Sequence, residues 1–182
     1  MIYQDTWVNG SLVAKGQRDC ASRYDIVKSV CAPYGSGFSV LDIGANMCYF
    51  GLRLIEDFNC TVMAFEFNSF DLRERNVKAN KTDRLILLKR KLTIKDIEIL
   101  SNSCHFDFVL MMSVLHHLPG NSTEWLNAVR KIGDNIIVEF ALEDSTRIDI
   151  RQDYKIPNDG KIIGYGDSHL KQNFKRPIVL LK

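Results

Sequence analysis

The chain has 182 residues, 46% of them hydrophobic, which is enough for a full core and predicts a single domain over residues 1–182. A formal net charge of +2 gives no polyanion-binding signature, so charge alone does not support nucleic acid as a partner. No apolar run reaches the ~20 residues of a membrane span, and the first residues lack the pattern of a signal peptide.

Five cysteines are scattered along the chain without a C-x-x-C pair. An odd and unpatterned set indicates reduced thiols and no zinc site, so we expect a cytoplasmic protein without a bound metal. Most of these cysteines are expected to be small, buried apolar residues.

The first part of the chain is expected to form a cap segment over residues 1–36. Residues 1–16 are predicted to be irregular, with a turn at Asn9–Gly10. A helix is predicted over residues 17–31, because apolar residues recur there at helical spacing and a proline and a glycine follow.

Beyond the cap, apolar runs alternate with helical segments over residues 37–142, which predicts parallel strands joined by helices. The expected strands are Val40–Ile43, Thr61–Glu66, Leu85–Leu88, Phe106–Met112 and Asn135–Phe140. The expected helices cover residues 49–58, 68–80, 93–100 and 122–132. Thr93 and Asp96 have the spacing of a capping box at the third helix.

The pattern changes over residues 143–182. Residues 143–157 are polar and weakly periodic, whereas 161–166 and 177–181 read as two closing strands. The predicted fold class is therefore α/β, with a mostly parallel seven-stranded sheet, an antiparallel C-terminal hairpin and helices on both faces.

The turn after the first expected strand predicts a ligand site. Asp42 lies at the strand's C-terminal end, where open α/β sheets bind ligands, and Gly44 permits close approach to the backbone. Glu66 ends the next strand 24 residues later, near the ~20 at which a Rossmann-type unit places its ribose-binding carboxylate. Either carboxylate could instead be a solvated strand-end group or a helix cap.

This strand, turn and helix resemble the first nucleotide-binding turn of the class I S-adenosylmethionine (SAM) methyltransferases, whose usual form is acidic-x-Gly-x-Gly-x-Gly. Asn46 and Cys48 stand where the second and third glycines would be. The resemblance implies a Rossmann-like fold, SAM as cofactor and S-adenosyl-L-homocysteine (SAH) as product. It implies that Glu66 takes the ribose hydroxyls and that Gly44, Ala45 and Asn46 line the methionine portion.

The same resemblance assigns cofactor contacts to segments that follow three later strands. It places Phe67 after the second strand and Leu92 where this fold contacts adenine. Ser113 and Leu115 follow the fourth strand, where the fold holds the methionine end. Helix capping by Thr93 and simple loop packing are the alternatives for these two segments.

Two adjacent histidines, His116 and His117, also follow the fourth strand, where the acceptor should meet the methyl group. Imidazole can remove a proton, and imidazolium can hold an anion, so both are candidate catalytic residues. One of them could equally be structural. No third ligand is suggested by spacing, so no metal is expected here.

Arg18 and Arg23 place two cations on or near the predicted helix that leads into the site. A guanidinium group offers a bidentate partner for the free carboxylate of SAM. The alternative is a solvated helix face.

A narrower resemblance rests on an ordered set of motifs from residue 2 to the C-terminus. The motifs are Ile2–Gln4, Arg18–Val27, Val40–Gly44, Phe106–Asp107, Ser113–His117, Glu139–Ala141, Ile163–Leu170 and Arg176–Pro177. Together they resemble the methyltransferase domain of the bifunctional methyltransferase/kinases that terminate O-antigen polysaccharide chains. By that resemblance Tyr3 and Arg23 contact SAM, and Gly44, Glu66 and Leu115 continue the site.

This family methylates a phosphate on the terminal sugar, which implies polysaccharide modification and a glycan or phosphoglycan acceptor. His169 and Arg176 would suit an anionic or sugar acceptor, although both could be surface loop residues. Cys48 departs from a glycine that the family keeps, and Glu66 replaces an aspartate. Small-molecule or RNA methylation remains an alternative, as does a non-catalytic SAM-binding or partner module on the same fold.

Overall fold

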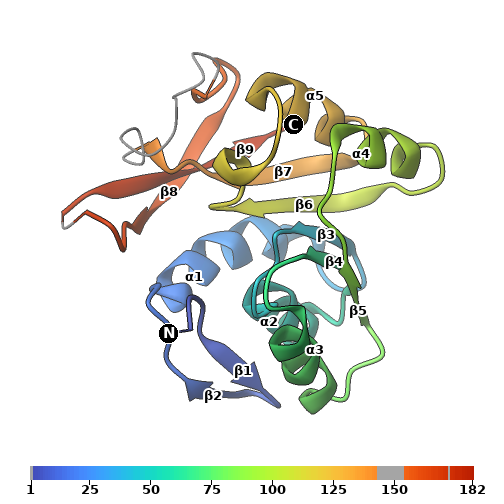
Figure 1. Cartoon of the computed structure of the whole chain (residues 1–182), viewed down its shortest axis with the longest axis vertical. Helices are drawn as coiled ribbons and strands as arrows, with labels where there is room; N and C mark the ends of the chain where they lie inside the picture. Colours follow the sequence, from blue (N-terminus) through green and yellow to red (C-terminus); the bar gives the residue numbers. More distant parts are fainter. Residues whose placement is uncertain (1, 143–153, 172) are drawn as a thin grey trace. The chain divides into compact units, whose positions relative to one another are not determined.

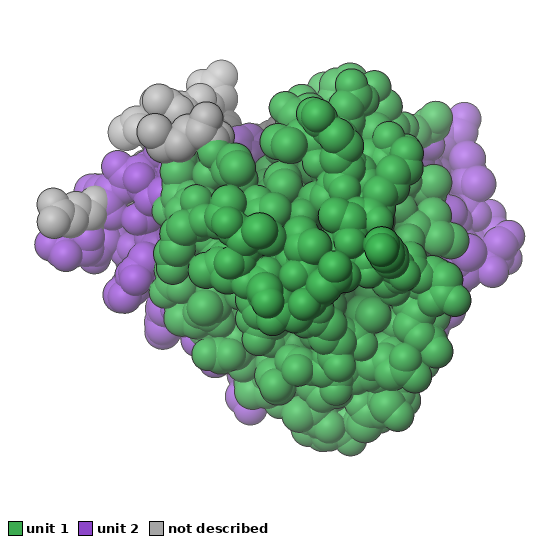
Figure 2. Space-filling view, turned by 90° about the horizontal axis from the view of Figure 1, so that it is seen from below, with its two compact units in different colours: residues 1–91 green, residues 92–182 purple. Residues whose placement is uncertain are grey.

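A computed structural model describes residues 2–142, 154–171 and 173–182 (Figure 1). Its seven-stranded, mostly parallel sheet has the strand order β5-β4-β3-β6-β7-β9-β8, which confirms the predicted α/β class. Most of the polar segment predicted over 143–157 lies outside the described residues. The chain divides into two compact units, residues 1–91 and 92–182, which Figure 2 colours separately and which are described in turn.

The first unit holds a hairpin, three helices and three parallel strands. Its elements are β1 (Thr6–Val8), β2 (Ser11–Ala14), α1 (Cys20–Cys31), η1 (Ala32–Tyr34), β3 (Ser39–Ile43), α2 (Tyr49–Phe58), β4 (Thr61–Glu66), α3 (Phe70–Ala79) and β5 (Leu85–Lys89). Helix α2 packs against α1 and β4, and α3 packs against β5. The apolar face predicted for the first helix is confirmed, because four of its residues are fully buried: Cys20, Tyr24, Val27 and Cys31.

The prediction that residues 1–16 are irregular is wrong for residues 6–14, which form the antiparallel hairpin β1–β2. The predicted turn at Asn9–Gly10 is confirmed, and both of its residues adopt positive φ, 47° and 77°. The two strands are short and β2 is largely exposed, so neither carries the alternation of a half-buried strand.

Helix α1 begins at Cys20, three residues later than predicted. The Asp19 side chain accepts the backbone N–H of Ser22 at 3.3 Å and so forms the N-cap. The N–H of Gln17 and the N–H of Arg18 donate instead to the carbonyl oxygens of residues 2 and 3, both at 3.1 Å. These bonds hold residues 17 and 18 outside the helix.

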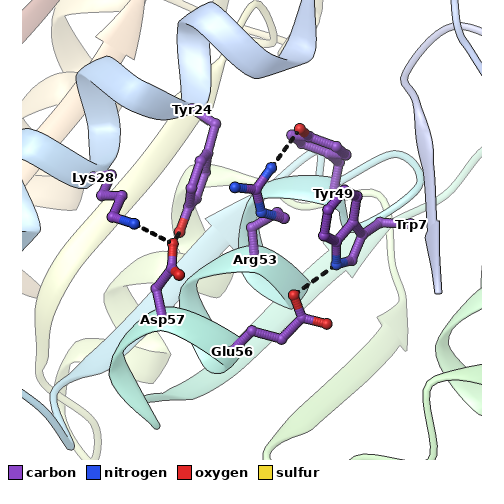
Figure 3. A network of polar contacts seen from close by, with 7 residues as sticks. All are labelled: Trp7, Tyr24, Lys28, Tyr49, Arg53, Glu56 and Asp57. Atoms are coloured by element: carbon purple, nitrogen blue, oxygen red, sulfur yellow. Dashed lines mark hydrogen bonds and ion pairs between the residues drawn. The ribbon is translucent and has the colours of Figure 1, made fainter. Parts of the chain in front are cut away.

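A stack around Arg53 fastens the hairpin to helix α2 (Figure 3). The Arg53 guanidinium carbon lies 4.3 Å from the ring centroid of Trp7 and 4.3 Å from that of Tyr24, and Nη1 donates to the Tyr49 hydroxyl at 2.9 Å. Glu56 accepts the Trp7 indole N–H at 2.7 Å. Hairpin, α1 and α2 therefore meet at one cation.

On the far side of Tyr24, its hydroxyl donates to Asp57 at 2.5 Å, and Lys28 forms an ion pair with the same carboxylate at 3.0 Å (Figure 3). Tyr24 thus links the arginine stack to an ion pair between α1 and α2. Burial raises the pKa of Asp57, but the hydrogen bond from Tyr24 together with the hydrogen bond and charge of Lys28 lowers it more. The pKa of Asp57 is therefore below its ordinary value.

We expect Arg53→Met to lower the free energy of unfolding by about 1–3 kcal/mol, because it removes two close cation–π contacts and a hydrogen bond. Urea denaturation followed by tryptophan fluorescence measures this. Arg75→Met, at an exposed position of α3, is the matched control and should cost less than about 0.5 kcal/mol. Equal losses in the two variants would contradict a special role for the stack.

The described residues of the second unit form two α-helices, a short 3-10 helix and the remaining four strands of the sheet. Its elements are α4 (Ile94–Ser101), β6 (Phe106–Met112), η2 (Leu115–His117), α5 (Ser122–Arg130), β7 (Gly133–Glu139), β8 (Lys161–Asp167) and β9 (Lys175–Leu181). Strand β6 runs parallel to β7, whereas β9 is antiparallel to both β7 and β8. The predicted antiparallel closing hairpin is therefore confirmed.

Two local predictions in this unit can be compared with the structure. The capping box at Thr93 and Asp96 is confirmed, with both reciprocal bonds present. Helix α5 ends at Arg130 and not at the predicted Ile132. The carbonyl of Ile132 instead accepts the backbone N–H of Phe106 at 2.8 Å, at the start of the β6–β7 pairing.

Candidate functional site

Two carboxylates lie at the C-terminal ends of adjacent parallel strands in the first unit. Asp42 in β3 is 2% exposed, and Glu66 is the last residue of β4. Asp42 Oδ2 has no hydrogen-bond partner among the described residues. Burial, and secondarily the charge of Glu66, raise the pKa of Asp42 to about 7. Asp42 is therefore not a solvated strand-end group. A cationic ligand beside it would favour its ionised form near neutral pH.

The turn after β3 is fastened to the end of β4. The N–H of Gly44 and the N–H of Ala45 both donate to the Phe65 carbonyl, at 2.9 and 3.1 Å, and the N–H of Asn46 donates to Glu66 Oε2 at 2.9 Å. Three successive amide donors are thus used within the chain. The Asn46 Oδ1 acceptor is buried beside them and has no partner in the described part of the chain. Such a site suits a cationic group.

Asn46 and Cys48, which replace two expected glycines, both adopt a left-handed backbone, with φ of 50° and 58°. Glycine takes this conformation without steric cost, and asparagine tolerates it better than most residues. The structure therefore retains the glycine-type turn without these glycines.

The Cys48 side chain is fully buried, with 0% exposure. Cys48 therefore packs in the protein interior. Burial, together with the charges of Asp42 and Glu66, raises the pKa of this thiol well above its ordinary value of 9.0, and the thiol stays protonated.

Glu66 also organises the segment before α3. Its Oε1 accepts the backbone N–H of Phe67 at 2.7 Å and that of Asn68 at 2.8 Å. These two residues are accordingly outside the helix, which begins at Phe70 and not at the predicted residue 68. A carboxylate has about four acceptor positions, so the three bonds orient Glu66 and leave capacity for a ligand hydroxyl. Phe67 beside it is 51% exposed.

The two arginines of the N-terminal region are buried, with 1% exposure for Arg18 and 0% for Arg23. The solvated helix face considered as an alternative is therefore wrong for both. Arg18 Nη1 donates to the Tyr3 hydroxyl at 3.2 Å, and the Arg23 guanidinium lies 5.3 Å from the Phe50 ring centroid on α2. Tyr3 thus meets Arg18, while Arg23 packs on the helix that follows the turn.

In the second unit, a buried polar cluster joins residues at the ends of β6, β7 and β9. Ser113 Oγ donates to Glu139 Oε2 at 2.6 Å and accepts from Arg176 Nη1 at 3.1 Å. Glu139 and Arg176 are both 0% exposed, so the surface-loop alternative for Arg176 is wrong. This burial favours a role for Arg176 in holding Ser113, which itself has a left-handed φ of 57°.

Glu139 was not among the predicted site residues, although a signal was present. It is a carboxylate at the end of an otherwise apolar strand, Ile136–Val138. Such a residue is either solvated or paired, and the hydroxyl that it accepts from, on Ser113, is 26 residues away in the sequence.

The two adjacent histidines have different environments. His116 is buried, its ring stacks on His117 with centroids 3.8 Å apart, and it meets Tyr154 edge-on at 6.2 Å. His117 is exposed. Of the two, only His117 presents its ring to solvent, where an acceptor could reach it.

The remaining predicted residues of this unit lie at separate positions. Leu92 and Leu115 are buried. Thr93 caps helix α4, which was the alternative to a cofactor contact for the segment that follows β5. His169 is exposed, between β8 and β9. Among the described residues, no cluster of three His, Cys, Asp or Glu side chains could hold a metal ion. No helix in the described part of the chain is both long and apolar enough to cross a bilayer.

We expect Asp42→Asn to change how stability depends on pH. Because the folded-state pKa of about 7 lies above the ordinary 3.8, Asp42 favours folding fully below about pH 4, and this contribution is lost as the pH rises through 7. Asparagine does not titrate. The stability of the variant relative to the native chain should therefore rise by about 2–4 kcal/mol between pH 4 and 8.

Urea denaturation at pH 4, 6 and 8 measures this difference. Asp83→Asn, at an exposed position, is the control and should change stability by less than about 0.5 kcal/mol throughout. A difference between Asp42→Asn and native protein that stays constant with pH would mean that Asp42 is ionised in the folded state.

We expect Arg176→Met to lower the free energy of unfolding by about 2–3 kcal/mol, because it removes a buried charged donor to Ser113, whose hydroxyl binds the buried Glu139 carboxylate. Arg130→Met removes an ion pair with the exposed Asp159 and should cost about 1 kcal/mol or less. Thermal and urea denaturation of both variants give the comparison. A loss for Arg176→Met no larger than that for Arg130→Met would argue that Arg176 is available to a ligand.

The fold is that of the class I methyltransferases, as comparison with solved structures shows. The chain resembles the bifunctional kinase-methyltransferase WbdD, with a TM-score of 0.71 and 21% identity over 92% of this chain. It spans 40% of the WbdD chain. Magnesium protoporphyrin IX methyltransferase (ChlM) from Synechocystis PCC 6803, solved with bound SAH, matches 87% of this chain and 81% of its own, with a TM-score of 0.60 and 13% identity. No protein-family model matches the sequence, and no curated protein does.

Proposed function

We propose that this protein is a SAM-dependent O-methyltransferase. The observation that carries the proposal is a buried carboxylate, Asp42, and an oriented one, Glu66, around a turn in which the amides of Gly44, Ala45 and Asn46 are already hydrogen-bonded. SAM carries a positive sulfonium and a positive ammonium group, and its ribose has two hydroxyls. Asp42 and the Asn46 side-chain oxygen suit the cationic methionine end, and Glu66 suits the ribose.

Further contacts are proposed on the family resemblance. Tyr3 and Arg23 would bind the methionine carboxylate end, and Phe67 and Leu92 would contact adenine. Ser113 and Leu115 are assigned to the methionine end as well. The exposed ring of Phe67 and the buried arginines agree with this assignment, because a flat base prefers an aromatic surface and a carboxylate prefers guanidinium.

Bound SAM would supply an electrophilic methyl group for in-line transfer to an acceptor oxygen, with SAH as the leaving group. The chain's contribution is to align the two atoms and exclude water, which can provide much of the rate. His117 is exposed and next to the buried His116, so it is the proposed base or anion-binding group. A sugar hydroxyl needs such a base, whereas a phosphate oxygen needs none.

We propose a glycan or phosphoglycan terminus as the acceptor, with His117 and His169 as its contacts and Arg176 supporting them from the interior. The ordered motifs shared with the O-antigen-terminating enzymes support this choice. A small-molecule or RNA acceptor is the alternative on the same fold. A non-catalytic module, motivated by Cys48 and the missing glycines, is the further alternative.

Calorimetry with SAM and SAH tests the cofactor assignment. We expect binding in the micromolar range for the native chain and about 10-fold weaker binding for Glu66→Gln, which loses a charged acceptor. Glu98→Gln, at an exposed position of α4, should bind like the native chain. Absence of binding at millimolar SAM and SAH would refute the proposed function.

Transfer of a tritiated methyl group identifies the acceptor, with phosphorylated and unphosphorylated mannosides, small hydroxylated metabolites and RNA compared in parallel. For a hydroxyl acceptor, His117→Asn should lower kcat by about 10²–10⁴ because it removes the base. For a phosphate acceptor the same variant should mainly raise KM. Cofactor binding without transfer to any of these acceptors would favour the non-catalytic module.

A further inference from the structure

The turn that replaces two glycines contains Met47 between two left-handed residues, Asn46 and Cys48. Non-glycine residues carry a steric cost in this conformation, so the surrounding structure must hold them there. The bond from Asn46 to Glu66 restrains the first of them. The second needs a restraint of its own.

That restraint comes from helix α3. Asn76 Nδ2 donates to the carbonyl oxygen of Met47 at 2.8 Å, and the two side chains are buried, with 5% and 2% exposure. The Met47 carbonyl belongs to the peptide that joins Met47 to Cys48. Fixing this peptide therefore limits the rotation that would release Cys48 from its left-handed φ.

The buried face of α3 is polar, which is unusual for a helix packed on a sheet. The buried residues of this helix are Arg73 and Asn76, one turn apart. The hydrogen bond from Asn76 to the Met47 carbonyl places this face of α3 against the turn. A helix that buries an arginine and an asparagine there, at the cost of apolar packing, is suited to holding a backbone in place.

We propose that Asn76 is a positioning residue that stands in for the missing glycines, by holding the turn in the conformation that receives the cofactor. This rests on the proposed function. Asn80 extends the support, since its side-chain amide donates to the Asn76 carbonyl at 2.8 Å and to the Trp7 carbonyl at 2.9 Å. The turn is thereby connected through α3 to the N-terminal hairpin.

Asn76→Asp tests this directly, because it preserves shape and removes the donor. In the absence of cofactor, we expect amide hydrogen exchange of residues 44–49 to become about 10-fold faster, and SAH binding to weaken about 10-fold. Asn59→Asp adds the same charge at an exposed position and should change neither. If Asn76→Asp does not fold, Asn76→Ala removes the amide without adding charge and gives the same comparison.

The Cys48→Gly background separates positioning from general stability. Glycine adopts the turn conformation without restraint, so the loss of SAH affinity caused by Asn76→Asp should shrink there to about threefold or less. An unchanged exchange rate in Asn76→Asp, or an equal loss in both backgrounds, would overturn the proposal. If the native chain does not bind SAH, the proposed function fails, while the exchange measurement still decides the role of Asn76.

Discussion

The Phe65 carbonyl, with the Glu66 carboxylate beside it, is the point on which the candidate site depends. It receives the amides of Gly44 and Ala45, and Glu66 receives the amide of Asn46, so the end of β4 determines the path of the turn after β3. Because these three backbone amides are already hydrogen-bonded within the chain, they are not available to a ligand. An anion site of the phosphate-loop kind would need the opposite arrangement, with free amides.

Most of the fold could be predicted from the sequence, because apolar runs such as Phe106–Met112 and Ile136–Val138 leave no alternative to buried strands. The hairpin β1–β2 could not. Its strands are short and partly exposed, and its attachment depends on Arg53, a residue distant in the sequence, whose stacking on Trp7 has no local signature.

The site divides in the same way. The positions of Asp42 and Glu66 at neighbouring strand ends could be predicted, because the strands that carry them could be predicted. The burial of Arg23, the pairing of Arg176 with Ser113 and the support of the turn by Asn76 depend on partners tens of residues away. Residue type shows that a polar group needs a partner when it is buried, and only the fold shows which partner it has.

The hairpin is attached to the first unit largely by polar groups: the Arg53 stack, Glu56 and Asn80. Leu12 and Val13 on β2 remain exposed, at 48% and 62%. Few buried apolar contacts oppose its release, so it forms a local unit that can open without unfolding the core. Since Asn80 also contacts Asn76, loosening at this distant edge would reach the candidate site as a change in mobility, with no change in its chemistry.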